Sequence, residues 1–145
     1  MGVRILFIHP ERIVREVVRK VLFQQFGDKA HCAPDTVSGL VAAKKRRPNL
    51  VFIYWRGSDL DAFDCYGRLR AMPGMKEIPV VFMGILCWRL WGKDPKEFFP
   101  KLQELGVSGY LNQPFRLDDL IEARTTILNG GSYYSEEQNH RPFRM

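Results

Sequence analysis

Residues 48–54 read Pro-Asn-Leu-Val-Phe-Ile-Tyr, an apolar run that begins after Asn49 and ends at Tyr54. A second run, Val80-Val81-Phe82-Met83, follows Pro79 and is also apolar throughout. Short runs without alternation are typical of parallel strands that are buried on both faces of a sheet. These two stretches therefore predict the middle of a parallel sheet.

Strand and helix patterns alternate outward from these runs. Further strands are expected at 3–8, 30–33 and 110–111. Helices are expected at 12–26, at 36–47, from Asp61 onward, up to Leu105, and from a start at Asp118 and Asp119 to an end at Asn129-Gly130. Five strands alternating with five helices predict a doubly wound α/β fold. In such a sheet the site lies at the carboxyl ends of the strands.

Helical periodicity predicts which side chains of the first two helices point inward. The apolar residues spaced three and four apart are Ile13, Val14, Val17, Val18 and Val21, followed by Val37, Leu40 and Val41 in the second helix. A helix ending at Leu105 contains Pro100, which removes a backbone hydrogen bond, so we expect that helix to be short or broken.

Length and composition indicate one soluble domain. The chain has 145 residues, of which 46% are hydrophobic, and no apolar run approaches the roughly 20 residues of a membrane span. We predict a domain at 1–129 and a linker-like tail at 130–145. Its three cysteines lack metal-ligand spacing, which favours reduced thiols in a cytoplasmic protein.

Four motifs in order resemble the receiver domain of bacterial two-component response regulators. They are Val3-Arg4-Ile5-Leu6-Phe7-Ile8-His9-Pro10-Glu11, Pro48 to Tyr54, Arg68-Leu69-Arg70 with Ile78-Pro79-Val80-Val81, and Gly106-Val107-Ser108-Gly109-Tyr110-Leu111-Asn112-Gln113-Pro114-Phe115. The resemblance covers about residues 3–129. It implies a flavodoxin-like receiver fold with a five-stranded parallel sheet and an altered fourth-helix region.

The resemblance also implies a phosphorylation pocket in which all five reactive residues have been replaced. His9 and Pro10 stand for two aspartates, Tyr54 for the phosphoacceptor aspartate, Gly84 for a threonine or serine, and Gln113 for a lysine. Phosphoryl transfer needs a carboxylate acceptor and Mg²⁺ with hard oxygen ligands. We therefore expect no catalytic residue, no metal and no cofactor, and not an enzyme.

Two expectations follow for the altered pocket. Tyr54 is expected to fill the former phosphate and metal space, with its hydroxyl bonded to Gln113 or to nearby backbone; the alternative is that it points to solvent. His9 is expected to be structural or exposed rather than a ligand, because no second ligand lies near it in the sequence.

The stretch 84–106 is longer than the family pattern and rich in aromatic residues. Trp88, Trp91 and Phe99, together with Tyr110, are predicted to form an interaction face for a protein partner or a homodimer. The alternative is that they pack on the domain's own core. With Gly84 in place of a threonine, Tyr110 is expected to turn inward in one orientation.

The chain is basic, with a formal net charge of +6. The run Lys44-Lys45-Arg46-Arg47 ends the second helix, where cations suit the helix dipole. We predict a phosphorylation-independent receiver-like domain that acts by protein–protein interaction in a two-component or related pathway. Two alternatives remain open: a nucleic-acid-associated regulator that uses the basic surface, and a small-ligand sensor that uses the altered pocket.

Overall fold

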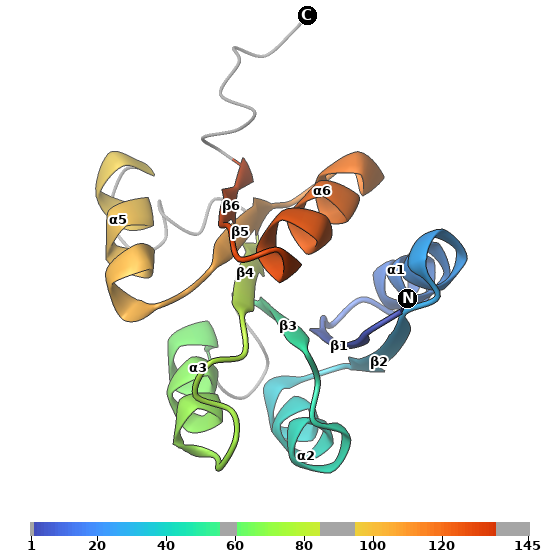
Figure 1. Ribbon diagram of the computed structural model, residues 1–145, viewed down its shortest axis with the longest axis horizontal. Coiled ribbons are helices and arrows are strands. Elements are labelled where there is room, and N and C mark those ends of the chain that lie inside the picture. Colours follow the sequence, from blue (N-terminus) through green and yellow to red (C-terminus); the bar gives the residue numbers. More distant parts are fainter. Residues whose placement is uncertain (1, 56–60, 85–94, 136–145) are drawn as a thin grey trace, which may run out of the picture.

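A computed structural model of the chain describes residues 2–55, 61–84 and 95–135. Strands and helices alternate along this part of the chain (Figure 1). The strands are β1 (Arg4–Ile8), β2 (Lys29–Ala33), β3 (Leu50–Tyr54), β4 (Val80–Gly84), β5 (Gly109–Asn112) and β6 (Tyr133–Tyr134). The helices are α1 (Arg12–Phe26), α2 (Thr36–Arg46), α3 (Ala62–Ala71), α5 (Pro95–Leu105) and α6 (Leu117–Leu128).

The strands form one parallel sheet in the order β2-β1-β3-β4-β5-β6. Helices α1 and α6 cover one face, and α2, α3 and α5 cover the other (Figure 1). The predicted doubly wound α/β fold is confirmed. Because β1 and β3 to β5 lie between two helical layers, their side chains are almost all buried.

The sheet has a sixth strand that the sequence did not predict. Strand β6 lies within residues 130–145, the predicted tail, and pairs Gly109 with Tyr133 and Tyr110 with Tyr134. A Cβ atom at Gly109 would lie 2.5 Å from the carbonyl oxygen of Tyr133, so only glycine allows this close pairing. Both tyrosines of β6 are buried, one on each face of the sheet.

Capping groups set the helix boundaries where the sequence predicted them. Gly27 ends α1 in the left-handed region at φ 73°, and the Asp35 carboxylate accepts the Ser38 N–H at 2.8 Å to begin α2. At the start of α3, Asp61 accepts the Asp64 N–H at 2.9 Å.

Helix α5 runs through Pro100 without a break, which corrects the predicted interruption. Phe98, Phe99 and Leu102 on this helix are fully buried. Packing of this apolar face outweighs the one backbone hydrogen bond that proline cannot make.

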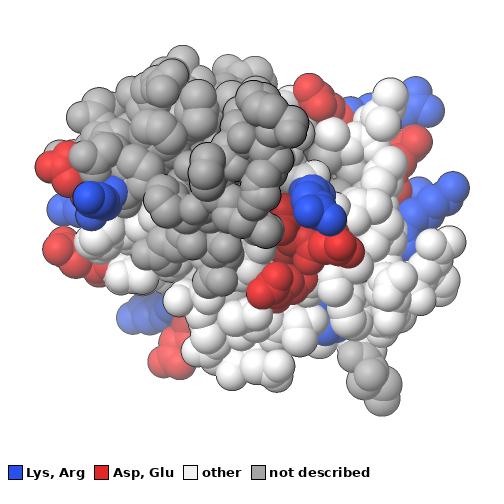
Figure 2. Space-filling view, turned by 90° about the horizontal axis from the view of Figure 1, so that it is seen from above, with Lys and Arg blue, Asp and Glu red and all other residues white. Residues whose placement is uncertain are grey.

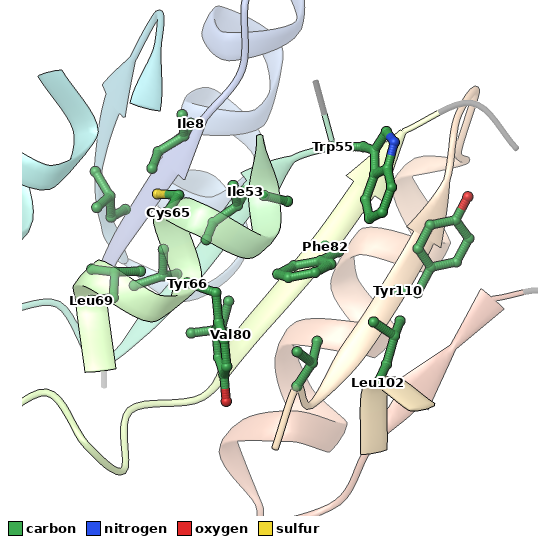
Figure 3. Packing of buried hydrophobic residues seen from close by; sticks show 14 of the residues in the cluster. Ile8, Ile53, Trp55, Cys65, Tyr66, Leu69, Val80, Phe82, Leu102 and Tyr110 are labelled. Carbon is green, nitrogen blue, oxygen red and sulfur yellow. The ribbon is translucent and has the colours of Figure 1, made fainter. Parts of the chain in front are cut away.

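Aromatic side chains fill the core between the sheet and the α3–α5 layer. Phe82 on β4 lies between Trp55 and Tyr66, with ring centroids 6.1 and 6.0 Å away (Figure 3). Phe98 contacts Trp55 at 5.8 Å and Tyr110 at 5.8 Å in edge geometry. This cluster joins the end of β3 to α5 and β5.

Four valines and isoleucines that the sequence placed inward are exposed instead. Ile13 and Val17 on α1 are 75% and 41% exposed, and Val37 and Val41 on α2 are 52% and 53% exposed. Each helix has an apolar stripe wider than the part of it that the sheet covers. No helix in the described residues is long and apolar enough to cross a membrane.

Candidate functional site

Four strand ends converge where the sequence placed the altered pocket. His9 follows β1, Tyr54 ends β3, Gly84 ends β4 and Gln113 follows β5. The Gln113 N–H donates to the Gly84 carbonyl at 2.8 Å, which holds the β4 and β5 ends together. Pro10 is exposed beside His9 and contributes no side-chain oxygen.

His9 is the central side chain of this site and is fully buried. Its Nε2 is 2.8 Å from Oε1 of Gln113, and its Nδ1 accepts the Glu11 N–H at 3.0 Å. Because Nδ1 is an acceptor, the ring proton lies on Nε2, which donates to Gln113. Both nitrogens are therefore satisfied only when the imidazole is neutral.

The electrostatic environment agrees with a neutral imidazole. Burial lowers the pKa of His9 below its usual 6.5, although the Gln113 hydrogen bond and the Glu11 carboxylate act in the opposite direction. The Arg15 guanidinium donates to the His9 carbonyl at 2.8 Å and disfavours a second positive charge nearby.

Tyr54 packs edge-on against this imidazole, with ring centroids 4.6 Å apart and planes at 63°. The Phe7 ring also stacks on His9, with ring centroids 5.8 Å apart and planes at 6°. Tyr54 is half-buried, so its ring lies partly within the site and partly at its mouth. We expected Gln113 as one possible partner of the Tyr54 hydroxyl; in the structure, Oε1 of Gln113 is bonded to His9.

The five described positions of this site, 9, 10, 54, 84 and 113, carry no carboxylate that could accept a phosphoryl group. Its side chains are an imidazole, a phenol and a carboxamide, and residues 9, 10 and 54 supply no carboxylate. No cluster of three or more His, Cys, Asp or Glu residues that could hold a metal occurs in the described ranges. These donors do not fit Mg²⁺, which prefers anionic oxygen ligands.

Sequence reasoning missed two contributors to this site. The Glu11 N–H and the Arg15 side chain both bind His9, one at the start of α1 and one in its first turn. Proximity in sequence to His9 is the only signal that could have found them.

The predicted aromatic interaction face is not on the surface where it can be checked. Phe99 is 1% exposed and Tyr110 is fully buried, so the structure corrects the prediction for these two residues and favours the core alternative. Trp88 and Trp91 lie outside the described residues. Tyr110 points inward, as expected, and its hydroxyl donates to Asn112 Oδ1 at 2.8 Å and lies 3.3 Å from the Gly84 carbonyl.

The basic run at the end of α2 is solvent-exposed from Lys44 to Arg47. The Arg4 guanidinium donates to the carbonyls of Arg46 and Arg47 at 3.0 Å and so satisfies the end of the helix. Lys44, Lys45 and Arg46 lie in the last turn of α2, where the helix dipole favours positive charge.

Solved structures of response regulators resemble this chain over most of its length. The chemotaxis response regulator CheY4 of Vibrio cholerae is 18% identical with a TM-score of 0.73, over 86% of this chain and 98% of that one. A LuxR-family response regulator from Aurantimonas is 19% identical with a TM-score of 0.78, over 97% and 94%. The chain has the fold of response-regulator receiver domains.

A third receiver structure provides a chemical contrast. The receiver domain of a sensor histidine kinase of Pseudomonas aeruginosa is 18% identical with a TM-score of 0.66, over 89% of this chain and 96% of that one, and has a magnesium ion coordinated in its active-site cleft. No family model and no curated protein matches the sequence. The receiver fold is thus retained here around a different set of pocket side chains.

Proposed function

We propose that this receiver-like domain signals without phosphorylation, through protein–protein contacts in a two-component or related pathway. The observation that carries the proposal is the hydrogen bond between His9 and Gln113, which joins the ends of β1 and β5 across the site. Neutral side chains occupy the positions of an acceptor, its metal ligands and a cation. The domain is proposed to have no catalytic activity of its own.

The chemistry of the site supports independence from phosphate. A phosphoryl group brings a charge of about −2, which needs Mg²⁺, a hydroxyl and a cation to stabilise it. Gly84 has no side chain, and Gln113 is neutral and already bonded to His9. An incoming phosphoryl group would therefore have neither an acceptor nor a counter-charge.

The surroundings of Tyr110 support a permanent rather than a switched surface. In the family that the sequence resembles, an aromatic residue at this position reports the state of the threonine position. Here the Tyr110 hydroxyl is bonded to Asn112, and its ring packs 5.5 Å from Phe99. Turning this ring outward would break the bond and expose a buried aromatic surface, so the inward state is proposed to persist.

Intact-mass spectrometry after incubation with acetyl phosphate and Mg²⁺ tests this proposal. The unmodified chain should gain no phosphoryl mass, whereas a receiver domain with all five reactive residues serves as the positive control. A fivefold variant tests whether these positions alone prevent phosphorylation. It carries His9→Asp, Pro10→Asp, Tyr54→Asp, Gly84→Thr and Gln113→Lys. Stoichiometric phosphorylation of the unmodified chain would contradict the proposal.

A further inference from the structure

We infer that the face formed by α1 and the start of α6 is a homodimer interface in which two copies pack about a twofold axis. This inference rests on the proposed function, because it names a partner for the protein–protein contact proposed there. The face contains an apolar groove of about 200 Å³. Its lining comes from α1 and the β5–α6 connection: Ile13, Val14, Val17, Val18, Gln113, Pro114, Phe115 and Leu117.

The groove is bordered by large apolar side chains that the fold leaves open. Ile13, Val17 and Leu117 are 75%, 41% and 42% exposed. Phe115 and Ile121 next to them are half-buried. A contiguous apolar patch rimmed by polar residues is typical of a contact with another macromolecule. Because Ile13 projects beside a groove, one patch can supply both a protruding side chain and a recess to receive it.

Charge identifies the second copy as the occupant. Helix α1 carries Arg12, Arg15, Arg19 and Lys20 against a single acid, Glu16. Helix α6 carries Asp118, Asp119 and Glu122. Asp118 lies 3.6 Å from the exposed Arg116 that precedes the helix, and the one basic residue within the helix, Arg124, is paired with Asp28 in the interior. The groove therefore has a basic helix on one side and an acidic helix on the other.

In a twofold dimer, the charge difference between α1 and α6 produces two equivalent attractive contacts. In an isologous contact, α1 of one copy faces α6 of the other, and the reciprocal contact repeats the same pairing. Both contacts then join a basic helix to an acidic one over a shared apolar centre. Helices α1 and α6 lie next to each other on the same side of the sheet (Figure 1). Figure 2 shows acidic side chains gathered near the middle of one end of the molecule, with a basic side chain directly beside them and others at the edge of the view.

Sedimentation velocity of the full chain, at concentrations from about 1 to about 100 μM, tests the inference. We expect a monomer–dimer equilibrium that weakens as salt is added, since exposed charges are screened. The apolar centre is tested with Ile13→Ser, which should weaken dimerisation about tenfold or more. Val41→Ser on α2 is the matched control: Val41 is 53% exposed but lies away from the groove, so this variant should dimerise normally.

Charge exchange identifies the pairing between helices. One variant carries Arg12→Glu with Lys20→Glu, and the other carries Asp118→Lys with Glu122→Lys. Each variant alone should dimerise about tenfold or more weakly, because like charges then face each other in both contacts. An equimolar mixture should form heterodimers, since the acidic α1 of one variant meets the basic α6 of the other. If circular dichroism shows that a charge-exchanged variant does not fold, the comparison of dimerisation by Ile13→Ser and Val41→Ser still tests the interface.

Three results would overturn the inference: a chain that stays monomeric over the whole concentration range, equal effects of Ile13→Ser and Val41→Ser, or two exchanged variants that do not associate when mixed. A monomer that binds a different protein through this groove would reassign the face to that partner and also overturn the dimer. A monomer that accepts no phosphoryl group would overturn this inference alone, whereas acyl-phosphate formation would overturn the proposed function.

Discussion

At residue 9, an imidazole stands where the family that the sequence resembles has an aspartate, and it is held through both ring nitrogens. Nδ1 accepts from the Glu11 N–H and Nε2 donates to Gln113, and the rings of Phe7 and Tyr54 both pack against the imidazole. Protonation at Nδ1 would bring the imidazole N–H and the Glu11 N–H face to face and break this hydrogen bond. The hydrogen bonds and the lowered pKa of His9 therefore describe the same neutral state.

This state makes stability depend on pH. Because the pKa of His9 is lower in the folded chain than its ordinary 6.5, the unfolded chain binds the proton first as the pH falls. The stability contributed by His9 is complete above about pH 6.5 and decreases below it, by at most about 1.4 kcal/mol per pH unit. Urea unfolding at about pH 7.5 and about pH 5.5 should show a larger loss for the wild type than for His9→Asn. Burial also lowers the pKa of His31, but His31 is present in both proteins. Equal losses would contradict the neutral assignment.

The positions of the candidate pocket residues at strand ends could be predicted from the sequence, but their hydrogen bonds could not. The sequence predicts Tyr54, Gly84 and Gln113 at strand ends because each follows or closes an apolar run that is typical of a buried strand. The bond from His9 to Gln113 spans 104 positions, and no local pattern encodes it. We expected the Tyr54 hydroxyl to bond Gln113 or nearby backbone. The structure places Gln113 Oε1 2.8 Å from Nε2 of His9, a contact that depends on side-chain geometry in the folded chain.

Among the elements, α5 and β6 show where local patterns are insufficient. The prediction of a break at Pro100 weighed one lost hydrogen bond and omitted the burial of Phe98, Phe99 and Leu102. Strand β6 has two residues, too few for any periodicity, and is held by pairing with β5. By contrast, α1 runs from Arg12 to Phe26 as predicted, and α6 begins and ends close to its predicted limits.

Helix α5 also decides between core and interface for Phe99. Because this ring is buried against Tyr110 and Tyr134, Phe99→Ala should reduce the free energy of unfolding by about 3–5 kcal/mol. Gln103→Ala on the exposed side of the same helix should change it by less than about 0.5 kcal/mol. Thermal or urea unfolding compares the two variants. Similarly small changes in the free energy of unfolding for the two variants would contradict a core role for Phe99.

Helix α2 carries the exposed basic run, and its role determines the alternative function. If Lys44 to Arg47 mainly stabilise a helix end, binding to double-stranded DNA or single-stranded RNA should be no tighter than about micromolar at physiological salt. Fluorescence anisotropy with the wild type and a Lys44→Gln, Lys45→Gln variant measures this. A nanomolar complex that the variant abolishes would make nucleic-acid binding the leading function.

At the scale of the whole molecule, a buried ion pair joins Asp28, which follows α1, to Arg124 on α6. Arg124 on α6 donates to both Asp28 oxygens at 2.9 and 2.7 Å, and Asp28 also accepts the Val3 N–H at 2.9 Å. The Arg124 guanidinium lies 3.7 Å from the centre of the Phe26 ring. These contacts connect the start of β1 and the end of α1 to the last helix. The sequence did not single out this pair, because its members lie 96 positions apart.

Breaking this pair should be costly, since it leaves a charge in the interior. Arg124→Met is expected to lower the free energy of unfolding by about 3–5 kcal/mol, and Asp28→Leu combined with Arg124→Met by less than the sum of the single changes. The exposed Arg12–Glu16 pair provides a control, because Arg12→Met should cost less than about 1 kcal/mol. Urea unfolding gives each value. Equal costs for the two arginines would show that the Asp28–Arg124 pair does not contribute as a buried ion pair.

For the whole molecule, we propose a receiver fold whose pocket does not respond to a phosphoryl group. Amide NMR spectra recorded with and without beryllofluoride and Mg²⁺ test this most directly, because beryllofluoride imitates a phosphoryl group bound to an aspartate. We predict superimposable spectra, including the amides of Glu11, Tyr54 and Gln113. Saturable shifts of these amides that require both Mg²⁺ and beryllofluoride would contradict the account.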